Sequence, residues 1–136
     1  MKYFLQIIIF LLISFNVYGH ATIIIQGVKH ERGEIDVKIY TNKKNFLNED
    51  LAFESIRKKP TKGKTIIPLT KVHEGTIAIV AYHDEDNNGK LKTGLFWRPK
   101  EGFAFSNKYT PKGPPKFRKA AVELIHGKEI TIELNY

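Results

Sequence analysis

The 136-residue chain contains no cysteine, so it has neither a disulfide framework nor a cysteine nucleophile. The absence also excludes a bacterial lipoprotein anchor, which requires a cysteine at the cleavage site. The motifs G-x-S-x-G and H-E-x-x-H are missing, as is a glycine-rich phosphate loop. No segment keeps helical periodicity over three turns. The core must therefore come from packed β-sheets, with or without the help of a bound ion.

The first 19 residues are typical of a secretory signal. A positive residue, Lys2, precedes an almost wholly apolar run over residues 3–15, and Gly19 is a small residue suited to signal peptidase. The run is short for a membrane span and no stop-transfer charges follow it. We therefore predict export to the periplasm or the extracellular medium, although an uncleaved membrane anchor is the alternative interpretation.

Cleavage is expected after Gly19 or, alternatively, after Ala21. The remaining chain, residues 20–136, is predicted to form one domain without a membrane span.

The net charge of +8 has two local sources. They are residues 57–64 and the group Lys108, Lys112, Lys116, Arg118 and Lys119. Weak contact with anionic envelope surfaces is one interpretation, and a pair of solvated loops is the other. Export and the lack of interleaved aromatic residues argue against nucleic acid as a partner.

Alternating and β-branched segments predict about seven strands in an all-β sandwich. The expected strands are residues 20–28, 34–40, 51–58, 64–70, 76–82, 119–126 and 128–136. The first two are predicted to form a hairpin, and so are the last two, around Gly127. Residues 76–82 are apolar on both faces and should be central, whereas Pro68 suggests an edge strand. Phe46 and Leu47 are expected to fold back over the edge of the core.

Residues 84–115 are predicted to form one long ordered loop. Such a loop is ordered only when its own side chains hold it down. Phe103 and Phe105 are expected to pin it to the sandwich. Three further rings, those of Phe96, Trp97 and Tyr109, offer an apolar platform for a carbohydrate or another small ligand.

The start of this loop matches the first half of a calcium-binding loop. Asp84, Asp86 and Asn88 occupy its first, third and fifth positions, Gly89 the sixth, and Lys90 would supply a backbone carbonyl. Short oxygen-bearing side chains at alternate positions converge on one point, and glycine permits the sharp bend.

The second half of the loop departs from that pattern. Lys92 stands at the ninth position and Leu95 at the twelfth, where oxygen ligands belong. Glu85 or Glu101 would have to complete the site. Two interpretations remain open: a weak Ca²⁺ site, and a metal-free turn in which side chains accept hydrogen bonds from nearby backbone N–H groups.

Histidines provide two further hypotheses. His83 next to Asp84 would serve as a ligand or a general base, with Asp84 or Glu101 as its partner in an enzyme. His20 as the first residue of the mature chain would chelate copper through its amine and ring, provided that a second histidine lies nearby. The candidates for that second histidine are His30, His73, His83 and His126.

Nearly all of the mature chain resembles the bacterial exported domain of unknown function 2141 family. The resemblance begins in residues 33–40 and sharpens at residues 81–91, where the run H-D-x-[DN]-x-N-G-K-L occurs. It continues through residues 99–107, with E-G-[FY]-x-F-S-N, and through residues 113–117. It implies an antiparallel immunoglobulin-like or transthyretin-like β-sandwich and no established activity.

The resemblance also marks individual positions. They are His83, Asp84, Asp86, Asn88, Gly89, Glu101, Ser106 and Asn107. Members often carry Asp where this chain has Lys92, so the chain lacks one potential oxygen ligand. The leading hypothesis is an exported, non-enzymatic binding or structural module of unknown partner.

Overall fold

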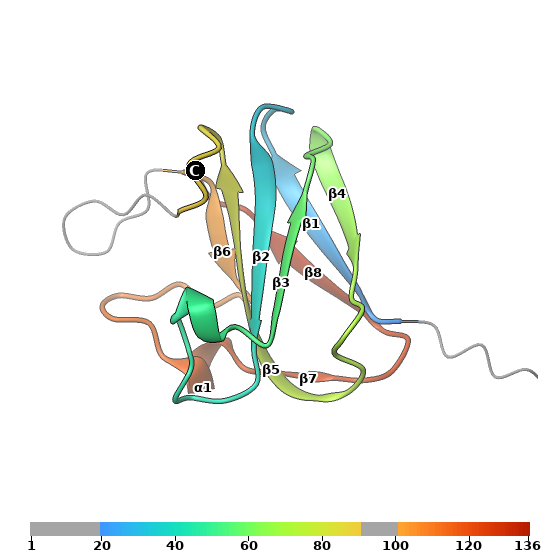
Figure 1. Ribbon diagram of the computed structural model, residues 1–136, viewed down its shortest axis with the longest axis vertical. Helices are drawn as coiled ribbons and strands as arrows, with labels where there is room; N and C mark the ends of the chain where they lie inside the picture. The colour runs from blue at the N-terminus through green and yellow to red at the C-terminus, as the bar shows by residue number, and fades with distance from the viewer. Residues whose placement is uncertain (1–19, 91–100) are drawn as a thin grey trace, which may run out of the picture.

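Two β-sheets face each other in the structure, a computed structural model that describes residues 20–90 and 101–136 (Figure 1). The first sheet has the order β4-β1-β8, formed by Gly63–Pro68, Thr22–Val28 and Glu129–Glu133. The second has the order β3-β2-β5-β6, formed by Glu54–Lys58, Glu34–Tyr40, Gly75–Asp84 and Phe103–Phe105. A short strand, β7 (Val122–Leu124), pairs with the start of β5. The predicted all-β sandwich is confirmed at this level.

Strand positions follow the local sequence pattern closely. β2 has the predicted bounds, β5 is central, and β4 with Pro68 is at an edge. β5 continues two residues further than predicted, through Asp84, because Glu34 of β2 pairs with Asp84. The predicted signal, residues 1–19, lies outside the described residues.

Strand pairing differs from the prediction at both ends of the chain. β1 and β2 form no hairpin: β1 pairs with β4 and β8, while β2 pairs with β3 and β5 in the other sheet. The last two strands form no hairpin either, because β7 joins β5 and β8 joins β1. The sandwich is not wholly antiparallel, since β1 and β8 run parallel. Burying apolar faces between two sheets favours these distant partners over sequence neighbours.

Three predicted segments also need correction. Residues 84–115 are not one uninterrupted loop, because β6 forms within them and brings the described strands to eight. The strand expected over residues 51–58 begins at Glu54, after a 3-10 helix, Glu49–Leu51. A single helical turn, α1 (Phe117–Ala120), precedes β7. No helix in the described part of the chain is long and apolar enough to cross a membrane.

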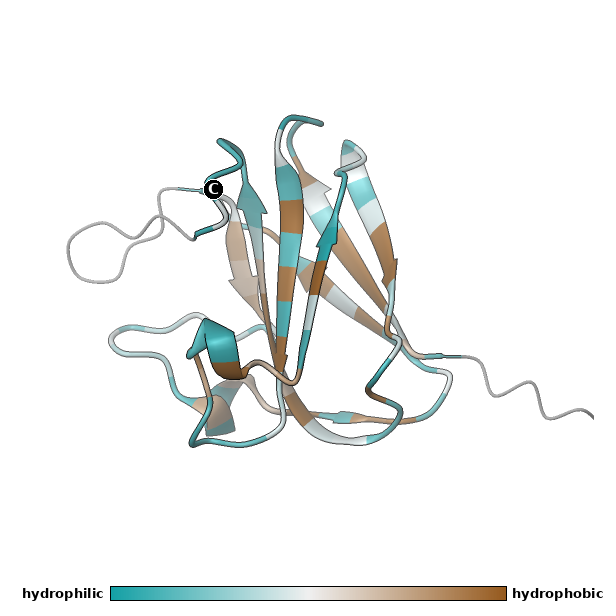
Figure 2. Cartoon of the chain, in the orientation of Figure 1, coloured by the Kyte–Doolittle hydropathy of each residue, from teal (hydrophilic) through white to brown (hydrophobic). Residues whose placement is uncertain are grey.

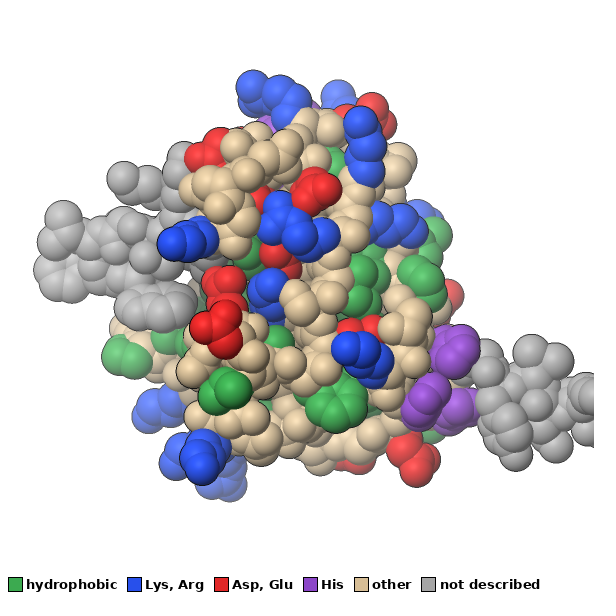
Figure 3. Space-filling view, viewed as in Figure 1, with side chains coloured by type: hydrophobic (Ala, Val, Ile, Leu, Met, Phe, Trp, Pro, Cys, Tyr) green, Lys and Arg blue, Asp and Glu red, His purple; other side chains and the backbone are tan. Residues whose placement is uncertain are grey.

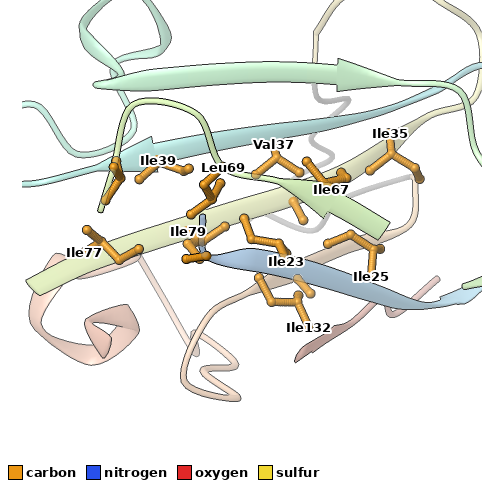
Figure 4. Close-up of a cluster of buried hydrophobic side chains, with 14 of the residues drawn as sticks. Ile23, Ile25, Ile35, Val37, Ile39, Ile67, Leu69, Ile77, Ile79 and Ile132 are labelled. Carbon is orange, nitrogen blue, oxygen red and sulfur yellow. The ribbon is translucent and has the colours of Figure 1, made fainter. Parts of the chain in front are cut away.

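The main core fills the space between the two sheets (Figure 4). Alternate residues of each strand point inward, so apolar and polar bands alternate along the ribbon (Figure 2). The inward set includes Ile23, Ile25, Ile35, Val37, Ile39, Ile67, Ile79 and Ile132, all 2% exposed or less.

A second apolar cluster covers the outer face of the second sheet. Tyr40, Tyr82, Phe103 and Phe105 belong to it. Segments 41–52 and 106–120 close over this face, and they contribute Phe46, Leu47, Ala52, Tyr109 and Phe117. The predicted return of Phe46 and Leu47 to the core edge is confirmed, and so is the apolar character of both faces of β5.

Candidate functional site

Asp84 is a fully buried carboxylate at the end of β5. Its Oδ1 accepts the backbone N–H of Asn88 at 3.1 Å, and its Oδ2 accepts that of Gly89 at 2.8 Å. Positive φ angles at Asn87 and Gly89, of 56° and 74°, turn the chain back so that these N–H groups point at the carboxylate. Asp84 therefore organises the loop through the backbone.

Neighbouring polar side chains continue this arrangement. Asn88 Oδ1 accepts the N–H of Lys90 at 2.8 Å, and Asp86 Oδ1 accepts that of Asn88 at 3.3 Å. Glu101, also buried, accepts the N–H of Glu85 at 3.2 Å. These are the side-chain to backbone bonds expected of the metal-free turn.

The same residues include a group that could hold a metal ion. One carboxylate oxygen from each of Asp84, Asp86 and Glu101 lies within 4.8 Å of the others. Such oxygens are suitable ligands for a hard cation. Lys92 and Leu95, which complete the comparison with a calcium loop, lie outside the described residues.

Arg57 binds the carboxylates at this end of the sheet. Its guanidinium donates to Glu34, to Asp36 Oδ2 at 3.1 Å and to Asp84 Oδ2 at 2.8 Å. The hydrogen bond to Asp84, followed by that to Glu34, raises the pKa of Arg57 above its ordinary value. The sequence placed Arg57 at the end of an expected strand and in a basic run, interpreted as an anionic contact surface or a solvated loop, and did not predict its carboxylate partners. The alternation along β3 was the available signal that Arg57 points to the opposite face of the sheet from Ile56.

Asp36 is the second buried carboxylate of this cluster. Its Oδ2 accepts the hydroxyl of Tyr82 at 3.0 Å, and its Oδ1 lies 3.1 Å from Lys38 Nζ. Burial and the nearby charge of Asp36 raise the pKa of Tyr82. Asp36 was not among the predicted site residues, because its place in the alternating strand over residues 34–40 indicated a side chain on the polar face.

His83 bridges two segments inside the domain. Its Nε2 faces the carbonyl of Arg32, which can only accept, so Nε2 carries the proton. Its Nδ1 then accepts the hydroxyl of Tyr136 at 2.7 Å, and that hydroxyl accepts the N–H of Lys29 at 3.2 Å. The ring is fully buried and both nitrogens are engaged.

His83 also belongs to a second group that could hold a metal, together with His30 and Glu85. His30 Nε2 lies 3.2 Å from Glu85 Oε2, and the two imidazole rings are 4.6 Å apart. Binding a metal through His83 would require it to give up one of the bonds that hold it in place.

The E-G-F-A-F-S-N run joins the second sheet to the covering segment. The buried Ser106 Oγ accepts the N–H of Ile79 at 2.8 Å and donates to the carbonyl of Ala120. Asn107 Nδ2 donates to the carbonyl of Lys119 at 3.0 Å. Phe103 and Phe105 hold this segment from β6, as the sequence suggested for the loop.

A groove of about 590 Å³ lies between the edge strands β6 and β8. Phe105, Tyr109 and Ile132 provide apolar walls, and Lys108 and Glu133 add opposite charges. The remaining lining residues are Gln26, Ala104, Thr110, Thr131 and Asn135. Of the predicted aromatic platform, Tyr109 is here, packed 5.4 Å from Phe105 between ring centroids. Phe96 and Trp97 lie outside the described residues.

The fold and the Asp84 loop define an all-β sandwich domain with metal-capable acidic and histidine groups. The chain belongs to the family described as an uncharacterized protein conserved in bacteria (DUF2141), whose model matches residues 23–133. This confirms the family resemblance identified in the sequence. No curated protein and no solved structure matches the chain.

Proposed function

We propose that this chain is an exported, non-enzymatic binding module whose ligand site is the groove between β6 and β8. The groove is the observation that carries this proposal. Its volume of about 590 Å³ falls within the range of roughly 300–1,000 Å³ typical of small-molecule sites.

The lining favours an oligosaccharide. The half-buried ring of Tyr109, supported from behind by the buried Phe105, suits the apolar face of a sugar ring, while Thr131, Asn135 and the charged rim suit hydroxyl groups. Export, predicted from the sequence, would bring such a ligand within reach.

The bonding of the motif residues supports a non-enzymatic role. His83, Asp84 and Ser106 are all buried, and each makes hydrogen bonds that hold segments of the fold together. A general base must be able to take up a proton from a substrate within hydrogen-bond reach. In His83 the nitrogen suited to that task already accepts the Tyr136 hydroxyl.

The groove can be tested by titrating ¹⁵N-labelled protein with a neutral glucan oligomer, a chitin oligomer and a uronic-acid oligomer. We expect saturable shifts of the Tyr109, Thr131 and Asn135 amides with at least one oligomer, and none along β3. Lys108→Ala and Glu133→Ala should weaken binding, whereas Lys64→Ala, which removes an exposed lysine on β4, should not. Unchanged groove amides with all three oligomers at millimolar concentration would contradict the proposal.

A weak Ca²⁺ site in the Asp84 loop is the second candidate, favoured by the proximity of Asp84, Asp86 and Glu101. Arg57 already supplies positive charge to Asp84, so bound Ca²⁺ would have to compete with it. For a dissociation constant near 1 mM, 10 mM Ca²⁺ would stabilise the fold by about 1.4 kcal/mol.

Thermal melting with and without 10 mM Ca²⁺ tests this candidate. The exposed Asp86 permits a matched pair: Asp86→Asn should remove the Ca²⁺-dependent rise in melting temperature, and Asp50→Asn should keep it. Arg57→Gln should enlarge the rise, because it removes the competing cation. The absence of a rise in both the wild type and Arg57→Gln would leave the loop as a metal-free, hydrogen-bonded turn.

A further inference from the structure

Three histidines from separate segments meet at the other end of β5 from the Asp84 loop. His20 precedes β1, His73 lies between β4 and β5, and His126 lies in the turn between β7 and β8. The ring centroids of His20 and His73 are 5.5 Å apart, and those of His73 and His126 are 6.1 Å apart. The three segments converge beside the start of β1 (Figure 1), and histidine side chains gather on the surface at that edge (Figure 3).

The backbone brings these segments together without help from the imidazoles. The carbonyl of Ala21 accepts the N–H of Leu69 at 2.8 Å, and Thr22 donates its N–H to the carbonyl of Lys128 at 3.2 Å. Thr22 also pairs with the end of β4 and with the start of β8. The main chains that carry all three histidines are therefore fixed relative to one another.

Glu54 holds the segment that leads into His73. Its carboxylate accepts the N–H groups of Thr70, Lys71 and Val72 at 2.9–3.2 Å, and Val72 is itself buried. His73 thus extends from an anchored backbone, which lowers the entropic cost of placing its ring in a ligand site.

The separation of the His20 and His73 rings lies in the range expected around one metal ion, and that of His73 and His126 lies slightly above it. The ligand nitrogens of the three histidines do not all lie within 4.8 Å of one another, so the exposed rings of His20 and His73 must rotate to bind one ion together with His126. An imidazole nitrogen about 2.0–2.1 Å from a metal leaves the centroids of two ligand rings about 5–6 Å apart. His20 and His73 are exposed, so an ion can reach them from solvent, whereas His126 is half-buried and its Nε2 is shielded from solvent. Imidazole donors select Zn²⁺, Cu²⁺ or Ni²⁺ rather than Ca²⁺ or Mg²⁺.

We propose that His20, His73 and His126 form a transition-metal site that binds Cu²⁺ more tightly than Zn²⁺, as the Irving–Williams order requires. The site is separate from the groove and from the Asp84 loop. It provides the second histidine that copper chelation by His20 demands. Cleavage after Gly19 would add the His20 amine as a further nitrogen donor.

The metals alone serve as probes, in a non-coordinating buffer at neutral pH. Isothermal titration calorimetry should show one equivalent of Cu²⁺ bound, and one equivalent of Zn²⁺ bound at the same site with lower affinity. The electron paramagnetic resonance spectrum of the Cu²⁺ form should show coupling to several nitrogens. Binding should weaken in mild acid, because protonated imidazole is not a ligand.

Single substitutions test each ligand in turn. His20→Ala, His73→Ala and His126→Ala should each weaken Cu²⁺ binding by about tenfold or more, and His73→Ala/His126→Ala should abolish it. The exposed positions of His20 and His73 allow those variants to fold, which circular dichroism would verify.

His30→Ala is the matched control, because it removes a histidine from the separate group with His83 and Glu85. We expect it to leave Cu²⁺ affinity unchanged. Loss of binding in His30→Ala, or equal binding by the wild type and the His73→Ala/His126→Ala variant, would overturn the assignment.

Discussion

At the scale of single residues, Glu54 shows how one carboxylate joins the two sheets. It starts β3 of the second sheet, is 2% exposed, and accepts hydrogen bonds from residues that follow β4 of the first sheet. Burial works to raise the pKa of Glu54, yet the bonds from the Thr70 hydroxyl and from the N–H groups of Thr70, Lys71 and Val72 lower it below its ordinary value. The ionised form is therefore favoured by folding.

Glu54→Gln should lower the free energy of unfolding at pH 7 by about 1–3 kcal/mol. The folded-state pKa lies below the unfolded value of about 4.3, so the stabilisation is complete above that pH and is lost as the pH falls through the folded value. Urea denaturation from pH 7 to pH 2 would show the difference between wild type and variant shrinking in acid. The exposed Glu129→Gln is the control, and a difference independent of pH would contradict this role.

Arg57 has a similar linking role within the second sheet. Its guanidinium contacts three carboxylates, and two of them are buried. Arg57→Ala should lower the free energy of unfolding by about 2–3 kcal/mol, since Asp36 and Asp84 would face each other without a bridging cation. The value is below that of a fully buried pair because the Arg57 side chain is 34% exposed.

Chemical denaturation of Arg57→Ala, Arg57→Lys and Arg118→Ala would check the role of Arg57. A lysine cannot span three carboxylates, so Arg57→Lys should recover only part of the loss. Arg118 is exposed in α1, and its replacement should change stability by no more than about 0.5 kcal/mol. Equal effects of Arg57→Ala and Arg118→Ala would remove the argument for the cluster.

At the scale of elements, the end of β5 depends on close contact with the connection between β1 and β2. Gly33 has a φ of 72°, and a Cβ built on it would lie 2.0 Å from the carbonyl oxygen of Asp84. Only glycine therefore allows this connection to pack against the strand whose last residue organises the acidic loop.

Gly33→Ala should lower the free energy of unfolding by at least about 2 kcal/mol, from backbone strain and the clash with Asp84. Gly113→Ala is the matched control, because a Cβ there meets no atom within 4 Å. Urea denaturation of the two variants would measure the difference. Similar stabilities would show that the connection can move away from β5 at little cost.

At the scale of the whole molecule, the described fold includes Ala21, which is 1% exposed and accepts the N–H of Leu69. A cut after Ala21 would remove this residue, whereas a cut after Gly19 would keep it. We predict that the signal is cleaved after Gly19, so intact-mass measurement should show His20 as the first residue of the mature chain.

A chain that starts at Thr22 should then be less stable than one that starts at His20, by about 1–2 kcal/mol. A chain that starts at Ala21 is the control, because it lacks only the exposed His20. Equal melting temperatures for all three chains would contradict a structural role for Ala21.

Local patterns were sufficient to predict where most strands lie. Alternation in residues 34–40 and apolar character on both faces of residues 76–82 identified β2 and the central β5. The E-G-F-A-F-S-N run was tied to the fold by its aromatics, but its glycine and irregular surroundings concealed the three-residue strand β6. A strand that short owes its existence to pairing with β5 and not to its own propensity.

The sequence by itself determined the all-β class, the family, and the short polar side chains of the loop after β5. Only the tertiary structure decided that β1 pairs with β4 and β8 instead of β2, that Arg57 serves three carboxylates, and that His20, His73 and His126 meet. The physical reason is that alternation is a local pattern, which indicates only which face of one strand is buried. Pairing and side-chain convergence depend on how distant segments bury those faces together.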